Sequence, residues 1–204
     1  MKNTLRYLVI AIAVAAAASS LPSMAEPLEE GMAAYTENDY VTTIKLWRPL
    51  AEQGVAAAQY RLGILYAEGK GVAPSDLIAF AWFQRAAEQG LDAAQYNLGV
   101  SYAEGLGTRK DDASAAKWFR RAADQGMPYA QLNLGLLYST GRGVPQDNVE
   151  AVKWLELAIF SLPPGGARSD AARVLKDAAD KMTDDELLKA RVLQRDFKAK
   201  PETK

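Results

Sequence analysis

The sequence predicts an all-α fold, an α/α superhelical solenoid of tandem helix hairpins, and three observations support this. The segment Ala58–Tyr66 recurs as Ala94–Tyr102 and again as Ala130–Tyr138, each time 36 residues further on. Paired glycines follow each copy, at positions 69 and 71, 105 and 107, and 141 and 143. A tryptophan then lies at the same place in each copy, at positions 82, 118 and 154. A fixed period of this length is typical of repeat arrays, in which each unit stacks on its neighbours.

The first 25 residues have the features of an export leader. Lys2 and Arg6 precede the apolar run 8–18, and Ser23-Met24-Ala25 places small residues at the expected cleavage position. The alternative is an uncleaved anchor, but the run is shorter than the roughly 20 residues that a membrane helix needs. We therefore expect cleavage near Ala25 and a mature protein in the bacterial periplasm or secreted, with no membrane insertion.

The composition restricts both partners and chemistry. Without Lys2 and Arg6, the mature chain keeps 22 basic and 25 acidic side chains, a net charge of −3. Neither nucleic acid nor an anionic membrane is therefore an expected partner. The chain has no cysteine and no histidine, which removes disulfides, the usual general base and most zinc sites. We expect no cofactor and no metal.

Each repeat is expected to hold two helices. In the first copy, Ala58, Leu62 and Tyr66 form an apolar stripe at helical spacing, and the glycine pair ends that helix. The second helix of each repeat is expected to begin after an N-cap residue, which is Ser75, Asp111 or Asp147. In the third copy, Glu150 would complete a capping box with Asp147.

Close helix packing is expected inside each repeat. The second helices combine alanines with large aromatic residues, a pattern that allows two helices to interlock. Gly63, Gly99 and Gly135 interrupt the first helices, and each costs about 1 kcal/mol relative to alanine, so we expect close contact there. The strict period of the tryptophans likewise predicts packing. The alternative is that they stack on bases or sugars.

Ala-x-x-x-Leu-Gly-x-x-Tyr, followed by Gly-x-Gly and then Trp-x-x-x-Ala-Ala-x-x-Gly, resembles the Sel-1-like repeat over about residues 55–162. This resemblance implies a superhelix related to tetratricopeptide repeats, with about three and a half units and the first helices lining a concave wall. Bacterial relatives serve as envelope adaptors, signalling regulators or polysaccharide-export accessories, and some contact host factors. The last helix pair resembles the closing segment of such proteins.

The expected organisation follows from these signals. Residues 1–25 are the leader, 26–55 a tetratricopeptide-like hairpin, 56–91, 92–127 and 128–162 the repeats, 163–197 the C-terminal capping helices, and 198–204 a disordered tail. The capping helices are expected from about Ser169 to Lys181 and from Thr183 to about Phe197, the second with a Thr183–Glu186 capping box. Pro49 is expected to kink the helix before the first repeat.

The resemblance also suggests a binding face on the first helices of the repeats. The candidate residues are Tyr60, Arg61, Ile64, Tyr96, Asn97, Val100, Leu132, Asn133 and Leu136. They would hold an extended peptide, with the asparagines binding its backbone. The alternative is that the apolar members pack against the adjacent repeat. The invariant Gln59, Gln95 and Gln131 suggest a structural hydrogen bond instead.

The expected function is a non-catalytic protein-interaction module that binds another protein or a peptide, with a monomer as the expected state. The alternative is a β-lactam or cell-wall hydrolase or ligand-binding protein, since Ser114 and Lys117 satisfy a Ser-x-x-Lys pattern. The Sel-1-like proteins linked to β-lactams are, however, rich in cysteine. The acid pairs Asp111-Asp112 and Asp184-Asp185 stand at expected helix starts, where the helix dipole favours carboxylates.

Overall fold

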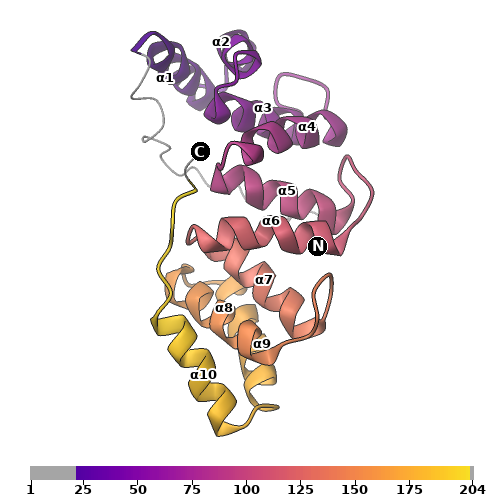
Figure 1. Cartoon of the computed structure of the whole chain (residues 1–204). Helices are drawn as coiled ribbons and strands as arrows, with labels where there is room; N and C mark the ends of the chain where they lie inside the picture. Colours follow the sequence, from indigo (N-terminus) through magenta and orange to yellow (C-terminus); the bar gives the residue numbers. More distant parts are fainter. Residues whose placement is uncertain (1–21, 203–204) are drawn as a thin grey trace. The chain divides into compact units, whose positions relative to one another are not determined.

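The computed structural model describes residues 22–202, and every regular element in that range is an α-helix. The helices are α1 (Pro22–Thr36), α2 (Tyr40–Glu52), α3 (Ala56–Glu68), α4 (Asp76–Glu88), α5 (Asp92–Glu104), α6 (Asp112–Asp124), α7 (Pro128–Thr140), α8 (Asn148–Ser161), α9 (Gly166–Ala179) and α10 (Asp184–Arg195) (Figure 1). The predicted all-α class is confirmed. The chain forms two compact units: α1–α5 belong to the first, which ends at Arg109, and α6–α10 to the second, which begins at Lys110.

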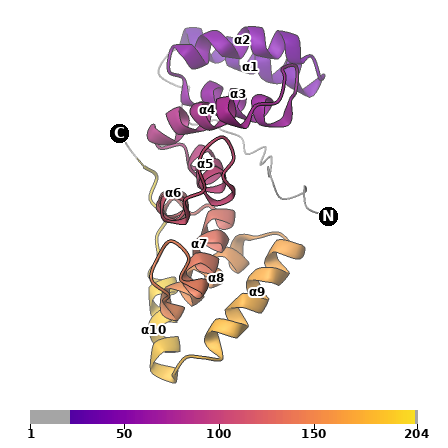
Figure 2. The same ribbon diagram turned by 90° about the vertical axis from the view of Figure 1, so that its right-hand side faces the viewer.

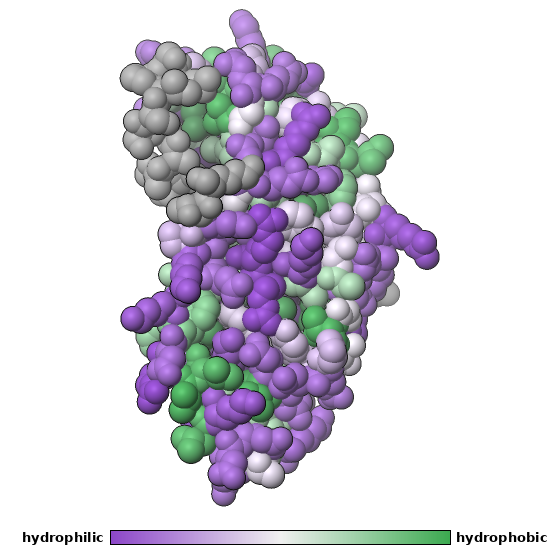
Figure 3. Space-filling model, in the orientation of Figure 1, coloured by the Kyte–Doolittle hydropathy of each residue, from purple (hydrophilic) through white to green (hydrophobic). Residues whose placement is uncertain are grey.

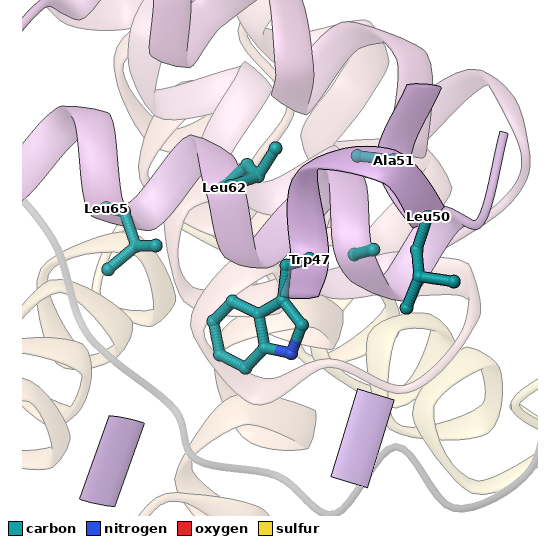
Figure 4. Close-up of a cluster of buried hydrophobic side chains, with 6 residues drawn as sticks. Trp47, Leu50, Ala51, Leu62 and Leu65 are labelled. Carbon is teal, nitrogen blue, oxygen red and sulfur yellow. The ribbon is translucent and has the colours of Figure 1, made fainter. Parts of the chain in front are cut away.

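In the first unit, each helix packs on the next one along the chain. Trp47 of α2 is 1% exposed and clusters with Leu50, Leu62 and Leu65 (Figure 4). Its indole N–H donates to the Leu28 carbonyl of α1 at 3.2 Å. This tryptophan therefore links α1, α2 and α3, although it lies outside the phase of the repeat tryptophans.

The predicted helix boundaries of the repeats rest on glycines and polar caps. Gly69, Gly105 and Gly141 have φ values of 69°, 74° and 68°, in the left-handed region that favours glycine at a helix end. The side chains of Ser75, Asp111 and Asp147 accept hydrogen bonds from the first turns of α4, α6 and α8. All three predicted N-caps are confirmed.

The capping box predicted for Asp147 and Glu150 is wrong. The Asp147 N–H, which the Glu150 carboxylate was expected to accept, donates to the Tyr138 carbonyl at 3.0 Å. The Glu150 carboxylate instead accepts the indole N–H of Trp154 at 2.8 Å. A residue one turn further along the same helix, together with Arg120 of α6 at 3.3 Å, thus takes the side chain that the pattern assigned to the helix end.

The second glycine of each pair lies against the start of an earlier helix. A Cβ on Gly107 would stand 2.1 Å from the Asp76 carbonyl oxygen, and a Cβ on Gly143 would stand 2.1 Å from that of Asp112. Gly71 meets the first residue of α2 with similarly little room. All three glycines have φ of 68° or 69°. Both the backbone conformation and the available space therefore require glycine.

Three buried glutamines tie each first helix to the helix before it. The Nε2 atoms of Gln59, Gln95 and Gln131 donate to the carbonyls of Ala51, Ala87 and Ala123 at 3.0, 3.3 and 3.3 Å. These carbonyls lie in the last turns of α2, α4 and α6, where intrahelical donors run out. The structural hydrogen bond predicted for the glutamines is confirmed.

The glycines inside the first helices allow close packing. A Cβ on Gly63 would lie 2.5 Å from the Phe83 ring, and one on Gly135 would lie 2.7 Å from Leu155 Cγ. The expected close contact is confirmed at these two positions. In both cases the contact joins the two helices of one hairpin.

Helix α8 is the centre of the second unit. Helices α7, α9 and α10 all pack on it (Figure 2). One buried cluster contains Leu132, Leu155, Ala158, Leu162 and Ala171, and another contains Val152, Ala178 and Ala190. Helices α9 and α10 therefore close the apolar face that the third repeat leaves open.

The ends of these last helices agree with the sequence in part. Helix α9 begins at Gly166, earlier than the expected start near Ser169. At the start of α10, the Thr183 N–H donates to Glu186 Oε2 at 2.8 Å, and the Glu186 N–H donates to Thr183 Oγ1 at 3.3 Å. This capping box is confirmed.

Residues 198–202 are bound to the second unit, whereas the sequence predicts a disordered tail over 198–204. The segment leaves α10 and runs in extended form past α8 to the end of α6 (Figure 1). There the Lys200 N–H donates to the Asp124 carbonyl at 3.0 Å, and Glu202 pairs with Arg121 at 2.6 Å. The tail thus supplies a donor that the helix end lacks. Its polar composition gave no sign of this contact.

Most of the predicted leader, residues 1–21, lies outside the described residues, and residues 22–25 form the first turn of α1. Across residues 22–202, none of the helices combines the length and the apolar character that crossing a membrane requires.

Candidate peptide-binding surfaces

The residues predicted to form a concave binding face lie on α3, α5 and α7 and differ in exposure. Tyr60, Ile64, Tyr96, Asn97 and Leu132 are buried, whereas Arg61, Val100, Asn133 and Leu136 are partly exposed. A buried side chain reaches a ligand only after its neighbours move. The four partly exposed residues are therefore the direct candidates for contact with a partner.

In the first unit, Tyr60 and Asn97 contact each other. Asn97 Nδ2 donates to the Tyr60 hydroxyl at 3.4 Å, a long hydrogen bond, and the Tyr60 ring lies 6.0 Å from that of Phe83. Burial raises the pKa of Tyr60 to about 12, so this phenol is protonated at neutral pH. The amide oxygen of Asn97 is buried and has no donor among residues 22–202. An unpaired buried acceptor costs about 1–3 kcal/mol, so packing alone gives no reason for it.

Arg61 is held against the N-terminal hairpin. Its guanidinium lies 5.2 Å above the Trp47 ring, and Nη1 lies 2.9 Å from Met32 Sδ. Burial lowers the pKa of Arg61 from its ordinary value, but an arginine remains charged at neutral pH. This fixed, partly exposed cation is suited to a carboxylate of a partner.

In the second unit, Leu132 and Leu136 have the packing role that the sequence offered as the alternative. Leu132 belongs to the buried cluster completed by Ala171 of α9, and Leu136 packs against the same cluster. Asn133 lies between them in the sequence and is partly exposed. Its side-chain amide makes no hydrogen bond within residues 22–202. Asn133 is therefore available to bind a peptide backbone.

Each repeat tryptophan carries an arginine over its ring. Arg85 lies 4.7 Å from the Trp82 ring centre, Arg121 lies 4.4 Å from that of Trp118, and Arg120 lies 4.9 Å from that of Trp154. Trp154 is fully buried, as the packing interpretation predicts, but Trp82 and Trp118 are only partly buried. The sequence interpretation missed these cation–π pairs. In the first two repeats, the Trp-x-x-Arg spacing of about one helical turn could have revealed them.

Apolar side chains on the surface are spread over several helices. Hydrophilic residues dominate the face shown in Figure 3, and hydrophobic residues gather at separate places among them. The large exposed apolar residues are Val41 on α2, Leu77 and Ile78 on α4, Phe160 on α8, and Leu188 and Val192 on α10. The asparagine amides and the arginine–tryptophan pairs are therefore better defined candidate contacts than these scattered apolar residues.

The Ser-x-x-Lys pattern has a helix-capping role. The Ser114 hydroxyl donates to Asp111 Oδ2 at 2.6 Å, and the Ser114 N–H donates to Asp111 Oδ1 at 3.1 Å. Lys117 is exposed, and no hydrogen bond joins it to Ser114 in the described part of the chain. The arrangement thus lacks the serine–lysine contact that would activate a nucleophile.

Comparison with known proteins identifies the family. The family model of the Sel1 repeat matches residues 56–91, 92–127 and 128–159. The chain belongs to the Sel1 repeat family. Its three Sel1 repeats correspond to the hairpins α3–α4, α5–α6 and α7–α8. The curated proteins yielded no match to the chain.

Two solved structures resemble this Sel1 repeat protein. One is c5321, a protective antigen of uropathogenic Escherichia coli with an SLR fold: it is 26% identical, has a TM-score of 0.57, and the match covers 85% of this chain and 45% of the antigen. This chain thus spans less than half of that antigen's length. The other is a Sel1 repeat protein from Oxalobacter formigenes, which is 37% identical with a TM-score of 0.56, over 64% of this chain and 95% of that one. The predicted helical solenoid is confirmed.

Proposed function

We propose that this Sel1 repeat chain is a non-catalytic protein-interaction module of the bacterial envelope, periplasmic or secreted after loss of its leader. Sel1 repeat proteins are generally protein-interaction modules. The proposal rests on a difference between two kinds of position in the repeats: those that are identical in all three copies and those that vary. The glutamines and glycines that are identical in all three repeats make structural contacts, as described above.

Other positions of the first helices differ from copy to copy. At the position after the repeat tyrosine or leucine, the three repeats carry Arg61, Asn97 and Asn133. The structural scaffold does not require one residue type there, so this position is free to select a partner. Arg61 suits a carboxylate, Asn133 a backbone amide, and the unpaired oxygen of Asn97 a backbone N–H.

The partner that fits this chemistry is an extended peptide or an exposed loop of another protein. Each amide–backbone hydrogen bond contributes about 0.5–1.5 kcal/mol, or roughly twofold to tenfold in affinity. The Asn97 oxygen is buried, so its neighbours must move before a partner can reach it. Asn133 needs no such movement.

The test is crosslinked capture from a periplasmic extract with the mature protein as bait. We expect a specific partner whose capture falls roughly twofold to tenfold in Asn133→Ala and in Asn97→Leu. Arg173→Ala, which alters an exposed arginine of α9, is the matched control and should capture normally. Unchanged capture by both asparagine variants would contradict a binding role for these two residues.

Two further measurements address location and catalysis. N-terminal sequencing of the exported protein should give Glu26 as the first residue if cleavage follows Ala25. Incubation with nitrocefin should give no turnover. Turnover that disappears in Ser114→Ala would contradict the non-catalytic assignment.

A further inference from the structure

The tail lies on the second unit in the way that a peptide ligand lies on its receptor. The backbone N–H groups of Lys200 and Glu202, two residues apart, donate to the Asp124 carbonyl at 3.0 Å and to Gln125 Oε1 at 3.1 Å. Alternate backbone donors of this kind are typical of an extended segment. They fix the backbone of the tail at the end of α6.

Two side chains anchor the ends of this segment. The Phe197 ring meets the Trp154 ring edge to face, with the ring centres 5.4 Å apart. The Glu202 carboxylate accepts from Arg121 Nη2 at 2.6 Å and from Nε at 3.0 Å. The bound segment therefore presents an aromatic residue five positions before a glutamate.

The receptor side chains are held by contacts that do not involve the tail. Arg121 stacks on Trp118. Trp154 donates to Glu150 and lies under Arg120. A surface whose anchors are fixed in advance loses little entropy when a segment binds. The contacts that hold Arg121 and Trp154 therefore do not require the tail.

The first unit shows the same stacking of an arginine on the repeat tryptophan. Arg85 stacks on Trp82 at the end of α4 as Arg121 stacks on Trp118 at the end of α6. Arg85 is exposed and forms no ion pair within residues 22–202. The stacked arginine is therefore a property of the repeat and does not depend on Glu202.

We propose that the surface formed by Arg121, Gln125 and Trp154 is a peptide-binding site that the chain's own tail occupies. A partner binds it by presenting an extended segment with an aromatic residue five positions before a glutamate. The tail competes with that segment and so limits binding until it is displaced. This inference deepens the proposed function by naming a second surface and the chemistry of its ligand.

The probe is a fluorescently labelled peptide with the sequence of residues 196–204. Fluorescence anisotropy compares its binding to the full-length mature protein and to a chain that ends at Asp196. We expect the truncated chain to bind the peptide at least tenfold more tightly, because a short tether keeps the native tail at millimolar effective concentration. The full-length variant Glu202→Lys, whose tail repels Arg121, should also bind more tightly than the wild type.

Charge exchange identifies the binding surface. In the truncated chain, Arg121→Glu should weaken binding of the native peptide, and a peptide with Glu202→Lys should restore it. Arg173→Glu is the matched control, since it makes the same charge change on α9, and it should have no effect. A peptide with Phe197→Ala should bind more weakly to every variant that binds the native peptide.

Three results would overturn the proposal: no binding to a truncated chain that still unfolds cooperatively, equal binding to full-length and truncated chains, or a full-length dimer that truncation dissolves. The last result would show that two copies exchange tails. The capture experiment probes α5 and α7, whereas this one probes the end of α6 and the middle of α8, so either can fail while the other succeeds.

Discussion

Gln95 and Asn97 stand two residues apart on α5 and are both buried, but their hydrogen bonding differs. Gln95 donates to the Ala87 carbonyl, whereas the Asn97 amide oxygen has no donor in the part of the chain that the structure describes. We expect Gln95→Leu to lower the free energy of unfolding by about 0.5–1.5 kcal/mol, because it removes a buried hydrogen bond to the Ala87 carbonyl, which also accepts from the Gly90 N–H at 3.0 Å. Asn97→Leu should cost less, because the substitution removes an unpaired acceptor together with the long hydrogen bond that Asn97 Nδ2 donates to the Tyr60 hydroxyl.

Urea unfolding followed by circular dichroism measures both variants. A larger loss in Asn97→Leu than in Gln95→Leu would show that Asn97 supports folding. In that case its unpaired oxygen would be no argument for a binding role.

Gly54 and Gly107 both have positive φ, of 95° and 68°, but their surroundings differ. A Cβ on Gly54 meets nothing within 4 Å, whereas one on Gly107 stands 2.1 Å from the Asp76 carbonyl oxygen. Gly54→Ala should therefore cost only the backbone strain of about 1–2 kcal/mol. Gly107→Ala should cost about 1–3 kcal/mol more, because the neighbouring backbone must move. Equal shifts in the urea midpoint would show that the loop adjusts freely.

At the scale of the helix, the capping box at the start of α10 should make the stability of the protein depend on pH. The backbone N–H and the hydroxyl of Thr183 hold the pKa of Glu186 below its ordinary value. A carboxylate with a lowered pKa contributes stability above the pKa of the unfolded chain, about 4.3 for glutamate. That contribution is lost as the pH falls through the lower folded value.

We therefore expect Glu186→Gln to lower the melting temperature at pH 7 and to have a much smaller effect at pH 3. Thermal unfolding of wild type and variant at both pH values measures this. Glu29→Gln, at an exposed glutamate of α1, is the control. If the effect of Glu186→Gln is the same at both pH values, the charge of Glu186 does not act through the cap.

The helices show which features a local pattern can predict. Some features depend on residues that recur or stand close in the sequence. These are the glycines with left-handed φ, the caps at Ser75 and Thr183, and the hydrogen bonds of the three buried glutamines. The Glu150 carboxylate was assigned wrongly because Trp154, one turn further along α8, and Arg120 of α6 both donate to it. The tail was assigned wrongly because its partner Arg121 becomes a neighbour only in the folded unit. The exposure of the candidate binding residues was unpredictable for the same reason, since α9 covers Leu132.

For the whole molecule, stability should be transmitted mainly between adjacent helices, as in other repeat arrays. Gln95 joins α5 to α4, whereas α9 and α10 pack on α8. We expect Gln95→Leu to speed amide hydrogen exchange in α4 and α5 far more than in α9 and α10. Exchange that accelerates equally in all four helices would instead indicate a single cooperative fold.

The contact between each second loop glycine and an earlier helix also determines where the chain accepts additional residues. An insertion between Gly105 and Gly107, or between Gly141 and Gly143, would move the second glycine away from the carbonyl that it touches. The connection before α9 has no such restriction, because a Cβ on Gly165 or Gly166 would meet nothing within 4 Å. A reporter sequence or an affinity tag placed there would leave the spacing of the Sel1 repeats intact.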